Sequence, residues 1–475
     1  MGRYLTFGTL VLAAVLAACS SSLNTSGAVP VTPATPGFGP GKYIKHIVLI
    51  VQENRSFDNL FDCFPGEDCI TTAPMATTDP QGKPVVVTRT LKPHHFNNCT
   101  NQYKLVNELC GDFSHDWKTA IANWDNGKMD GFGFENWGTT GQGTSTHGFA
   151  YGYVVRSEVK PYWDMAKQYT LLDRMFPDMF GPSFTAHLSL IAGTTAISSQ
   201  WAEIDLPVFT PWSCDSVEGG RSNPTVLVQR VAVGASGYLI PHYNQPVNPC
   251  FTQFNTMADV LDAKNVSWRY YAPQINDAGG SIWSEFGAIK KVRYGPDWAN
   301  VITPQTTVLT DIKNGKLPDM SWVIPDMLDS DHPSSYSNKG PSWVATVVNT
   351  VGESPYWKDT AIIVVWDDWG GWYDHVKPPQ VDYDGLGMRV PALIISPYAQ
   401  HHKVLHTQYQ FGSILHFVED VFSTGSLGYR DASSASLTGA FDFTQKPSAF
   451  KPFPVPEDYN YFLRRKPSFQ VPDQD

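Results

Sequence analysis

Two short runs of aliphatic residues stand out along the chain. Residues 47–51 and 361–366 are continuously apolar, with no polar residue at alternate positions. Strands that are covered by helices on both faces have this pattern, and such strands are typical of parallel sheets. We therefore predict two central strands of an α/β sheet.

Polar residues follow both runs at once. Gln-Glu-Asn-Arg follows residue 51, and Asp-Asp follows residue 366. Because parallel strands end at one edge of a sheet, we expect Glu53, Asp367 and Asp368 to lie close together there. Crowded carboxylates repel one another unless protons or a cation neutralise them, and a divalent metal ion is the simplest explanation. The alternative for either run alone is a strand that ends in a solvated turn.

The remaining periodic segments complete the α/β pattern. Further strands are predicted at residues 169–173, 320–325 and 389–396. Helices are predicted at 184–192 and at 409–422. A third helix is predicted from Trp117 onward, with Ser114 or Asp116 near its N-cap. Residues 62–115 and 196–300 break this rhythm, and we interpret them as loop excursions over the site. The Pro-rich tail from Lys446 shows neither the helical nor the strand period of apolar residues, so we expect it on the surface.

The first residues have the pattern of a secretory signal. In residues 1–18, Arg3 precedes an apolar core that is too short to span a bilayer. Leu-Ala-Ala-Cys19 followed by Ser resembles a bacterial lipobox, in which Cys19 would receive diacylglycerol; a plain signal peptide is the alternative. Residues 19–42 are mostly Ser, Thr, Pro and Gly, which predicts a flexible tether. Residues 43–455 would then form the globular domain, with a surface tail at 456–475.

Cysteine content indicates disulfide bonds, and net charge limits the binding partners that can be expected. Six of the seven cysteines remain when Cys19 is set aside, and an even number in an exported chain indicates disulfides. The shortest loops make 63–69, 99–110 and 214–250 the simplest pairing, and a zinc site is disfavoured because no Cys-x-x-Cys pair occurs. A net charge of −11 and a pI near 5.6 argue against binding to nucleic acid or to anionic lipid.

Seven motifs follow one another in order between residues 43 and 425. They are HIVLIVQENRSFD at 46–58, GKMDGF at 127–132, GPS at 181–183, SDHP at 330–333, DDWGG at 367–371, DHV at 374–376 and GMRVP at 387–391. Together they resemble the bacterial phosphoesterase family of phospholipases C and acid phosphatases. The resemblance implies an alkaline-phosphatase-like three-layer α/β/α sandwich with a mostly parallel central sheet and disulfide-pinned loop excursions.

The resemblance also implies a metal centre beside a serine nucleophile. Matched by position, the metal ligands would be Glu53, Asn54, Ser183, Asp367 and Asp368. All five side chains offer oxygen, which suits Ca²⁺, Mg²⁺ or Mn²⁺. The family usually has Asp-Glu where this chain has Asp367-Asp368, and the shorter side chain puts the coordination in question.

The remaining candidate roles concern the nucleophile and proton transfer. Ser183 stands at a strand-to-helix turn, where helix N–H groups would stabilise an alkoxide, and a plain N-cap serine is the alternative. The resemblance implies His115 and His332 as proton donors and oxygen clamps, with Asp130 orienting one of them. We expect His375 to be structural. His187 stands where the family often has Asn, and we assign it no role.

These residues predict an exported hydrolase of phosphoric esters, lipid-anchored in a bacterial cell envelope. We expect an acid-phosphatase-type phosphomonoesterase, because the chain lacks the extra C-terminal domains of the large family phospholipases and because both excursions are rich in polar residues. The alternatives are a phospholipase C acting on phosphatidylcholine-type lipids and a non-catalytic surface-binding lipoprotein. A sulfatase is disfavoured, because residues 181–185 do not supply its Cys/Ser-x-Pro-x-Arg motif.

Overall fold

The computed structural model describes residues 39–79, 81–96, 112–134, 148–199, 201–204, 213–215, 225–229, 243–247, 250–274, 282–335, 337–382 and 384–468. Its core is a nine-stranded sheet in the order β11-β10-β12-β1-β13-β14-β6-β15, with β16 also paired to β6. The strands are β1 His46–Gln52, β6 Thr170–Phe176, β10 Trp268–Tyr271, β11 Val301–Ile302, β12 Met320–Val323, β13 Thr360–Trp366, β14 Val390–Ile395, β15 Lys403–Leu405 and β16 Tyr409–Gln410.

The sheet is mostly parallel, as predicted. Every pair of neighbouring strands is parallel except the two pairs that β14 makes, with β13 and with β6. β1 and β13 lie side by side at the centre, and the apolar residues of both strands are fully buried. Burial on both faces explains why neither strand alternates apolar with polar residues.

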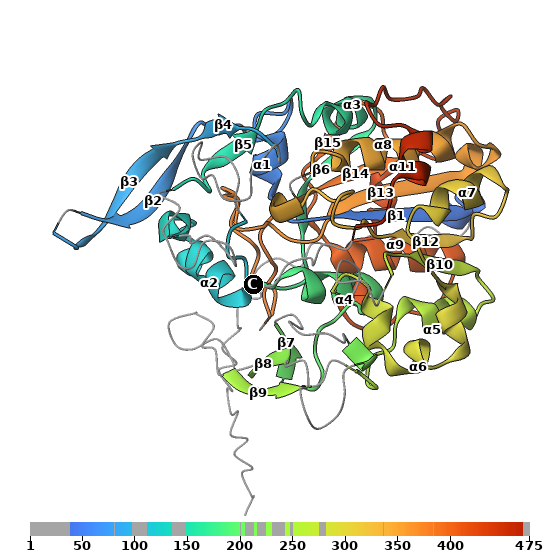
Figure 1. Ribbon diagram of the computed structural model, residues 1–475, viewed down its shortest axis with the longest axis horizontal. Coiled ribbons are helices and arrows are strands. Elements are labelled where there is room, and N and C mark those ends of the chain that lie inside the picture. The colour runs from blue at the N-terminus through green and yellow to red at the C-terminus, as the bar shows by residue number, and fades with distance from the viewer. Residues whose placement is uncertain are drawn as a thin grey trace, which may run out of the picture.

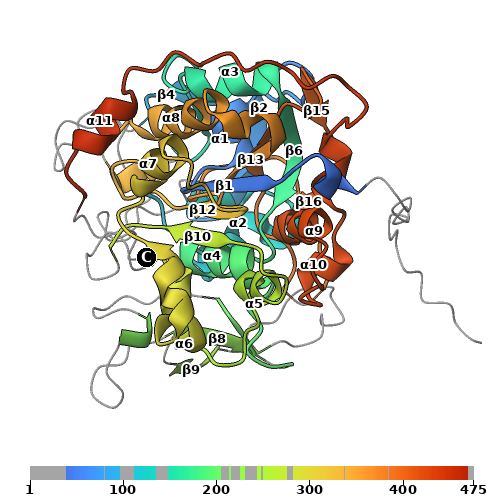
Figure 2. The same ribbon diagram turned by 90° about the vertical axis from the view of Figure 1, so that its right-hand side faces the viewer.

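Helices cover both faces of the sheet and complete a three-layer sandwich (Figure 1, Figure 2). One face carries α1 Phe57–Phe61, α3 Lys160–Gln168, α7 Thr307–Lys313 and α8 Gly340–Gly352. The other carries α4 Ser183–Ala192, α5 Met257–Asp262, α6 Lys290–Arg293, α9 Phe411–Phe422 and α10 Arg430–Ser433. The predicted helices at 184–192 and 409–422 are therefore confirmed, and α4 ends at Gly193 in the left-handed conformation.

The first excursion contains a projecting β-hairpin and the helix that follows it. β2 Thr72–Thr78 pairs antiparallel with β3 Pro84–Thr90, and this hairpin extends from the body of the molecule (Figure 1). β4 Lys92–His94 pairs with β5 Gly152–Val154. α2 Trp117–Trp124 begins at Asp116, whose carboxylate accepts a hydrogen bond from the N–H of Thr119.

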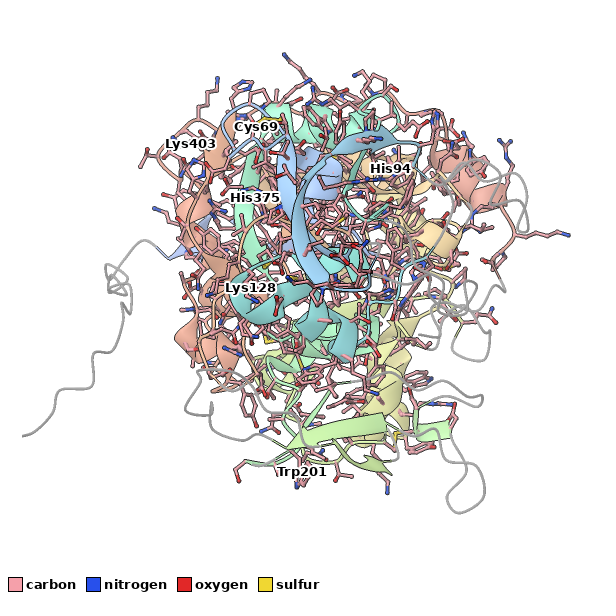
Figure 3. All side chains as sticks on the ribbon, turned by 90° about the vertical axis from the view of Figure 1, so that its left-hand side faces the viewer. Cys69, His94, Lys128, Trp201, His375 and Lys403 are labelled. Atoms are coloured by element: carbon pink, nitrogen blue, oxygen red, sulfur yellow. A yellow bond between two sulfur atoms is a disulfide. The ribbon has the colours of Figure 1, made fainter. Side chains whose placement is uncertain are left out.

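Disulfides fix both excursions, as predicted. Cys63 is bonded to Cys69 and Cys214 to Cys250, whereas the predicted 99–110 pair lies outside the described residues. The second excursion includes the small sheet of β7 Trp201–Glu203, β8 Thr225–Gln229 and β9 Tyr243–Val247. Cys69 and Trp201 lie at opposite ends of the face drawn in Figure 3, so the two excursions flank this face.

One interpretation of the chain was wrong. The part of the predicted excursion 196–300 that follows Cys250 is not a loop excursion, because β10 and β11 extend the central sheet and α5 and α6 pack beside it. β10 has the sequence Trp-Arg-Tyr-Tyr, whose aromatic side chains fill core space without forming an aliphatic run. The tail from Lys446 is mostly exposed, as predicted, but it contains a short helix that its sequence pattern did not indicate: α11 Tyr459–Arg464 packs on α8, with the ring of Phe462 5.2 Å from that of Trp343.

The N-terminal predictions lie outside the described residues. Residues 1–38, which include the predicted signal and Cys19, are not among them. In the part of the chain that is described, no helix combines the length and the hydropathy needed to cross a bilayer.

Candidate active site

The ends of β1 and β13 hold the predicted acids together. Gln52 pairs with Trp366, and the strand pairing continues beyond them, because the Asp367 N–H donates to the Gln52 carbonyl at 2.9 Å. The Asn54 N–H then donates to Asp367 Oδ1 at 2.8 Å. Glu53, Asn54, Asp367 and Asp368 are all fully buried. The structure thus brings the predicted ligands from two distant segments to one edge of the sheet.

The backbone at this edge is unusually tight. Asn54 has a φ of 61°, a left-handed conformation that Asn tolerates better than most residues with a side chain. Gly370, with a φ of +58°, packs directly against it, and a Cβ at this glycine would lie 2.3 Å from the Asn54 carbonyl oxygen. Only glycine fits here, so the DDWGG motif lets the two strand ends approach each other.

Ser183 lies at the start of α4 and its hydroxyl faces this cluster. The Oγ atom donates, at 3.3 Å in each case, to Asn54 Oδ1 and to Asp368 Oδ2. The plain N-cap interpretation is wrong, because Pro182 is the N-cap and no side chain caps the helix. Ser183 is also fully buried. Its hydroxyl therefore lies among the predicted ligands, at the positive end of the helix dipole.

His187 is part of the same cluster, although the sequence alone gave it no role. It lies one turn beyond Ser183 on α4, with Nε2 2.9 Å from Glu53 Oε1 and 3.7 Å from Asp367 Oδ2. Burial lowers the pKa of His187 to about 4 against the opposing effect of the Asp367 charge, so the ring is neutral. The spacing of four residues from Ser183 is the signal that could have found it, because such residues share one face of a helix.

The acids fit a divalent metal ion. Burial, followed by the charges of Asp367 and Asp368, raises the pKa of Glu53 well above its ordinary value. Glu53 Oε2 and Asp367 Oδ2 are buried and, among the described residues, have no hydrogen-bond partner. Candidate ligand atoms of Glu53, His187 and Asp367 lie within 4.8 Å of one another. Buried carboxylate oxygens without partners are costly, and a divalent cation removes that cost.

Both predicted histidines lie beside this cluster. His115 Nδ1 is 2.6 Å from the Phe113 carbonyl oxygen, which can only accept, so Nδ1 carries the proton. His115 Nε2 then accepts from Asn54 Nδ2 at 2.7 Å. This contact fixes the orientation of the Asn54 amide, with Oδ1 toward Ser183. The ring centroid of His332 is 6.0 Å from that of His115, and both rings are fully buried.

Two further residues of the first motif position the loop that carries His332. Gln52 accepts from the Asp331 N–H at 2.8 Å and donates to the Asp329 carbonyl at 3.1 Å. Arg55 donates to the Asp331 carbonyl from Nε at 3.0 Å and from Nη2 at 2.9 Å. The sequence gave no sign of this role, because the contacts join residues about 280 positions apart along the chain.

Asp130 lies apart from both histidines. Its polar partners among the described residues are Asp125 and Lys128 and, through its own carbonyl, Ala76 and Tyr151. Burial and the hydrogen bond with Asp125 raise the pKa of Asp130. Its predicted role in orienting a histidine has no contact to support it here, whereas His115 is oriented by a backbone carbonyl.

A second acidic cluster nearby is neutralised by the chain itself. Arg389 donates from Nη2 to Asp58 Oδ1 at 2.6 Å and from Nε to Asp374 Oδ1 at 2.9 Å. His375 Nδ1 lies 2.8 Å from Asp58 Oδ2, and Figure 3 shows His375 on the face between the two excursions. The guanidinium provides the positive charge, so these acids hold the fold together rather than an ion.

Comparisons with known proteins agree with the motifs. The family model described as Phosphoesterase family matches residues 44–425. Phospholipase C B of Mycobacterium tuberculosis is 26% identical, covering 92% of this chain and 85% of that protein. Phospholipase C A of the same organism is also 26% identical, covering 90% and 83%. A solved structure of a protein in the alkaline phosphatase superfamily from Vibrio parahaemolyticus is 12% identical, covering 57% of this chain and 63% of that one, with a TM-score of 0.30.

Proposed function

Because the chain belongs to the phosphoesterase family, and is therefore a hydrolase acting on phosphoester bonds, we propose that it is a phospholipase C with Ser183 as its nucleophile. The assignment of Ser183 as the nucleophile rests on the position of its hydroxyl, which lies 3.3 Å from both Asn54 Oδ1 and Asp368 Oδ2. A buried hydroxyl directed at a carboxylate and an amide oxygen, beside Glu53 and Asp367, which each have one oxygen without a partner among the described residues, is arranged for activation rather than for helix capping.

The chemistry assigns a separate task to each residue. Ser183 Oγ attacks phosphorus, its proton passes to Asp368, and the bond from phosphorus to the leaving oxygen breaks. His332 gives a proton from Nε2 to the leaving oxygen of the substrate. The other ring nitrogen of His332, Nδ1, lies 2.9 Å from Ser334 Oγ. Water then cleaves the bond between Oγ and phosphorus and releases the phosphorylated headgroup; a water proton returns to His332, and the proton on Asp368 returns to Ser183. When bound to Glu53, Asn54, Asp367 and Asp368, a divalent cation supplies positive charge for the phosphoryl oxygens and lowers the pKa of the serine hydroxyl.

The choice of a phospholipid rests on the relatives. Two proteins named phospholipase C align with this chain over more than four fifths of their own length. The prediction of a phosphatase rested partly on the C-terminal domains of the large phospholipases, and these two relatives do not support that reason. A phosphomonoesterase is the second candidate, and the polar composition of the excursions favours it. A surface protein without activity is disfavoured by the intact set of Ser183, Glu53 and Asp367.

We also propose an exported, lipid-anchored protein. The disulfides Cys63–Cys69 and Cys214–Cys250 support an oxidising compartment, where such bonds persist. The lipobox-like sequence at Cys19 supports an anchor of diacylglycerol.

The test compares three substrates on one preparation of the full chain, with and without EDTA. The substrates are phosphatidylcholine in mixed micelles, p-nitrophenyl phosphorylcholine and p-nitrophenyl phosphate. We expect the highest kcat/KM for the lipid, with diacylglycerol released and activity lost in EDTA. A higher kcat/KM for p-nitrophenyl phosphate would replace the phospholipase with the phosphatase. Turnover of none of the three would leave only a binding protein.

A further inference from the structure

A C-terminal segment contacts the loop that carries His332. This loop, residues 324–332, follows β12, and the segment, residues 457–468, contains α11. We call the segment the C-terminal strap. Arg465, which follows α11 directly, donates from Nη2 to Asp326 Oδ2 at 2.8 Å and to Asp329 Oδ2 at 2.6 Å. The Ser468 N–H donates to Asp326 Oδ2 at 2.9 Å, so the strap holds the loop at both acids.

The strap is itself fixed along α8. Ser342 Oγ donates to Glu457 Oε2 at 2.8 Å, and Thr346 Oγ1 donates to the Glu457 carbonyl at 3.1 Å. Further along the strap, the ring of Phe462 packs 5.2 Å from that of Trp343, and α11 lies beside α8 (Figure 1, Figure 2). The end of α11 is therefore a fixed point from which the strap reaches the loop.

The two acids that Arg465 contacts lie in the turn before His332. Asp326 Oδ1 accepts from the N–H groups of Leu328 and Asp329, at 3.1 Å in each case. The Asp326 carbonyl accepts from the N–H groups of Asp329 and Ser330, at 3.0 Å in each case. The Ser330 hydroxyl in turn accepts from the His332 N–H at 3.3 Å. A displacement of Asp326 would thus reach the backbone of His332 through this short run of hydrogen bonds.

The turn requires a cation at this point. Asp326 and Asp329 are both buried. Burial, followed by the charge of Asp326, raises the pKa of Asp329 to about 7, and Arg465 opposes this effect. Gln305 Nε2 also donates to Asp329 Oδ2, at 3.0 Å, but it carries no charge. Removing one partner of a buried ion pair leaves the other charge uncompensated. Without Arg465, the turn would have to open or one acid would have to take up a proton.

The loop is thus held from two sides. Gln52 and Arg55 hold the backbone at Asp331, as described above, and Arg465 holds the preceding turn. A general acid works only when its proton lies within hydrogen-bond reach of the oxygen that receives it. A misplacement of about 1 Å at a reacting group can lower the rate on the order of a hundredfold. Support from only one side would leave His332 free to make such a shift.

We propose that Arg465 is a positioning residue that holds His332 where it can give its proton to the leaving oxygen of the substrate. Arg465 acts through Asp326 and Asp329 and not on the substrate itself. This inference rests on the proposed function, in which His332 is the proton donor.

The experiment varies the leaving group and keeps the headgroup constant. The substrates are p-nitrophenyl, phenyl and benzyl phosphorylcholine, assayed with the full chain. The p-nitrophenolate ion is weakly basic and departs without a proton, whereas the benzyl alkoxide needs one. We compare kcat/KM, because it covers only the steps up to the departure of the leaving group. A misplaced acid should therefore lower kcat/KM most for the benzyl ester and least for the p-nitrophenyl ester.

His332→Asn gives the full effect of losing the acid. General acid catalysis contributes about 10²–10⁴-fold, so kcat/KM for the benzyl ester should fall by about that factor. Arg465→Met should show the same selectivity, with a loss of at least about thirtyfold for the benzyl ester and less than about threefold for the p-nitrophenyl ester. Arg465→Lys should recover most of the loss, because a single nitrogen, Nη2, contacts both acids and an ammonium group can take its place.

Arg464→Met is the matched control. Arg464 is the neighbouring residue and carries the same charge, but it is exposed at the end of α11, so this variant should keep the wild-type kcat/KM for all three esters. If Arg465→Met does not fold, Asp329→Asn is added to remove one of the two acids left without a cation, and the same selective loss is expected. If the substrates are phosphate monoesters, the same three leaving groups are compared as monoesters.

Two results would overturn the positioning role alone. One is an even loss across the three esters in Arg465→Met together with a selective loss in His332→Asn, which would make Arg465 a purely structural residue. The other is an unchanged benzyl ester constant in Arg465→Met, or an equal loss in Arg464→Met. A His332→Asn enzyme that loses all three esters alike would refute the proton donor of the proposed function, and this inference with it. The two failures appear in different variants, so they are distinguishable.

Discussion

Replacing Ser183 with alanine isolates the chemical step from the fold. The Oγ atom makes two hydrogen bonds, both 3.3 Å long, and it does not cap α4. An ordinary intramolecular hydrogen bond contributes about 0.5–1.5 kcal/mol, and bonds of this length lie at the lower end. We therefore expect Ser183→Ala to lower the free energy of unfolding by no more than about 2 kcal/mol.

The expected loss of activity is far larger. Without Oγ there is no nucleophile to form a phosphoserine, and only positioning and electrostatic stabilisation are left to act on a water molecule. We expect kcat to fall at least about a thousandfold, which corresponds to roughly 4 kcal/mol of the activation free energy. The contrast between a small change in stability and a large change in rate is the signature of a nucleophile.

The assay follows product release under saturating substrate, with the free energy of unfolding measured by urea titration. Ser189→Ala is the matched control, because Ser189 lies on the same helix, is fully buried and donates only to the Thr185 carbonyl, at 3.1 Å. It should keep most of the wild-type kcat. Acid quenching of the wild type during turnover of phosphatidylcholine should trap phosphorylcholine on the peptide that contains Ser183. A Ser183→Ala enzyme that keeps more than about a tenth of the wild-type kcat would refute covalent catalysis at this residue.

Four further changes test the rest of the argument. Asp367→Asn should weaken metal binding, and EDTA should inactivate the wild type until a divalent ion is restored; full activity of a metal-free enzyme would remove the metal from the mechanism. Arg389→Met leaves two buried carboxylates without their cation and should cost about 3–5 kcal/mol in urea unfolding, and a loss below 1 kcal/mol would contradict that role. Burial raises the pKa of Asp178 from 3.8 to about 7, so its contribution to stability is complete below pH 4 and is lost as the pH rises through 7. Asp178→Asn should therefore flatten the fall in unfolding free energy between about pH 4 and 7, and an unchanged slope would argue against the raised pKa. Cys19→Ser should release the protein from the membrane fraction at unchanged specific activity, because each buried acyl CH₂ contributes roughly 0.8 kcal/mol; continued sedimentation would require another anchor.

The elements that the sequence predicted well are those whose pattern has a single physical cause. β1 and β13 are buried on both faces, so residues 47–51 and 361–365 are all aliphatic, a run that is typical of a central strand. β10 lies second from the edge of the same sheet, where Arg269 is only partly buried while Tyr270 and Tyr271 fill the core, and this mixture has no simple period. The direction of β14 was also hidden, because an apolar run is the same read in either direction.

The candidate site shows the same division. The acids could be expected at one edge because strand ends determine where they lie, but the side chain that His187 would meet depends on how α4 rotates against the sheet. Gln52 and Arg55 belong to the same motif as Glu53 and Asn54, yet they hold the loop of His332 instead of the metal site. Tertiary contacts decide between these roles, and a single sequence does not contain them.

Two clusters of similar composition illustrate why. Each has two acids and one histidine: Glu53, Asp367 and His187 in one, Asp58, Asp374 and His375 in the other. The second receives the guanidinium of Arg389, because β14 runs antiparallel and its first residues therefore lie at the edge where β13 ends. The first receives no cation from the described chain, and its acids keep oxygens without partners. Protons or a cation can neutralise it, so the direction of one strand separates a cluster that the described chain neutralises itself from one whose acids remain open to a metal ion.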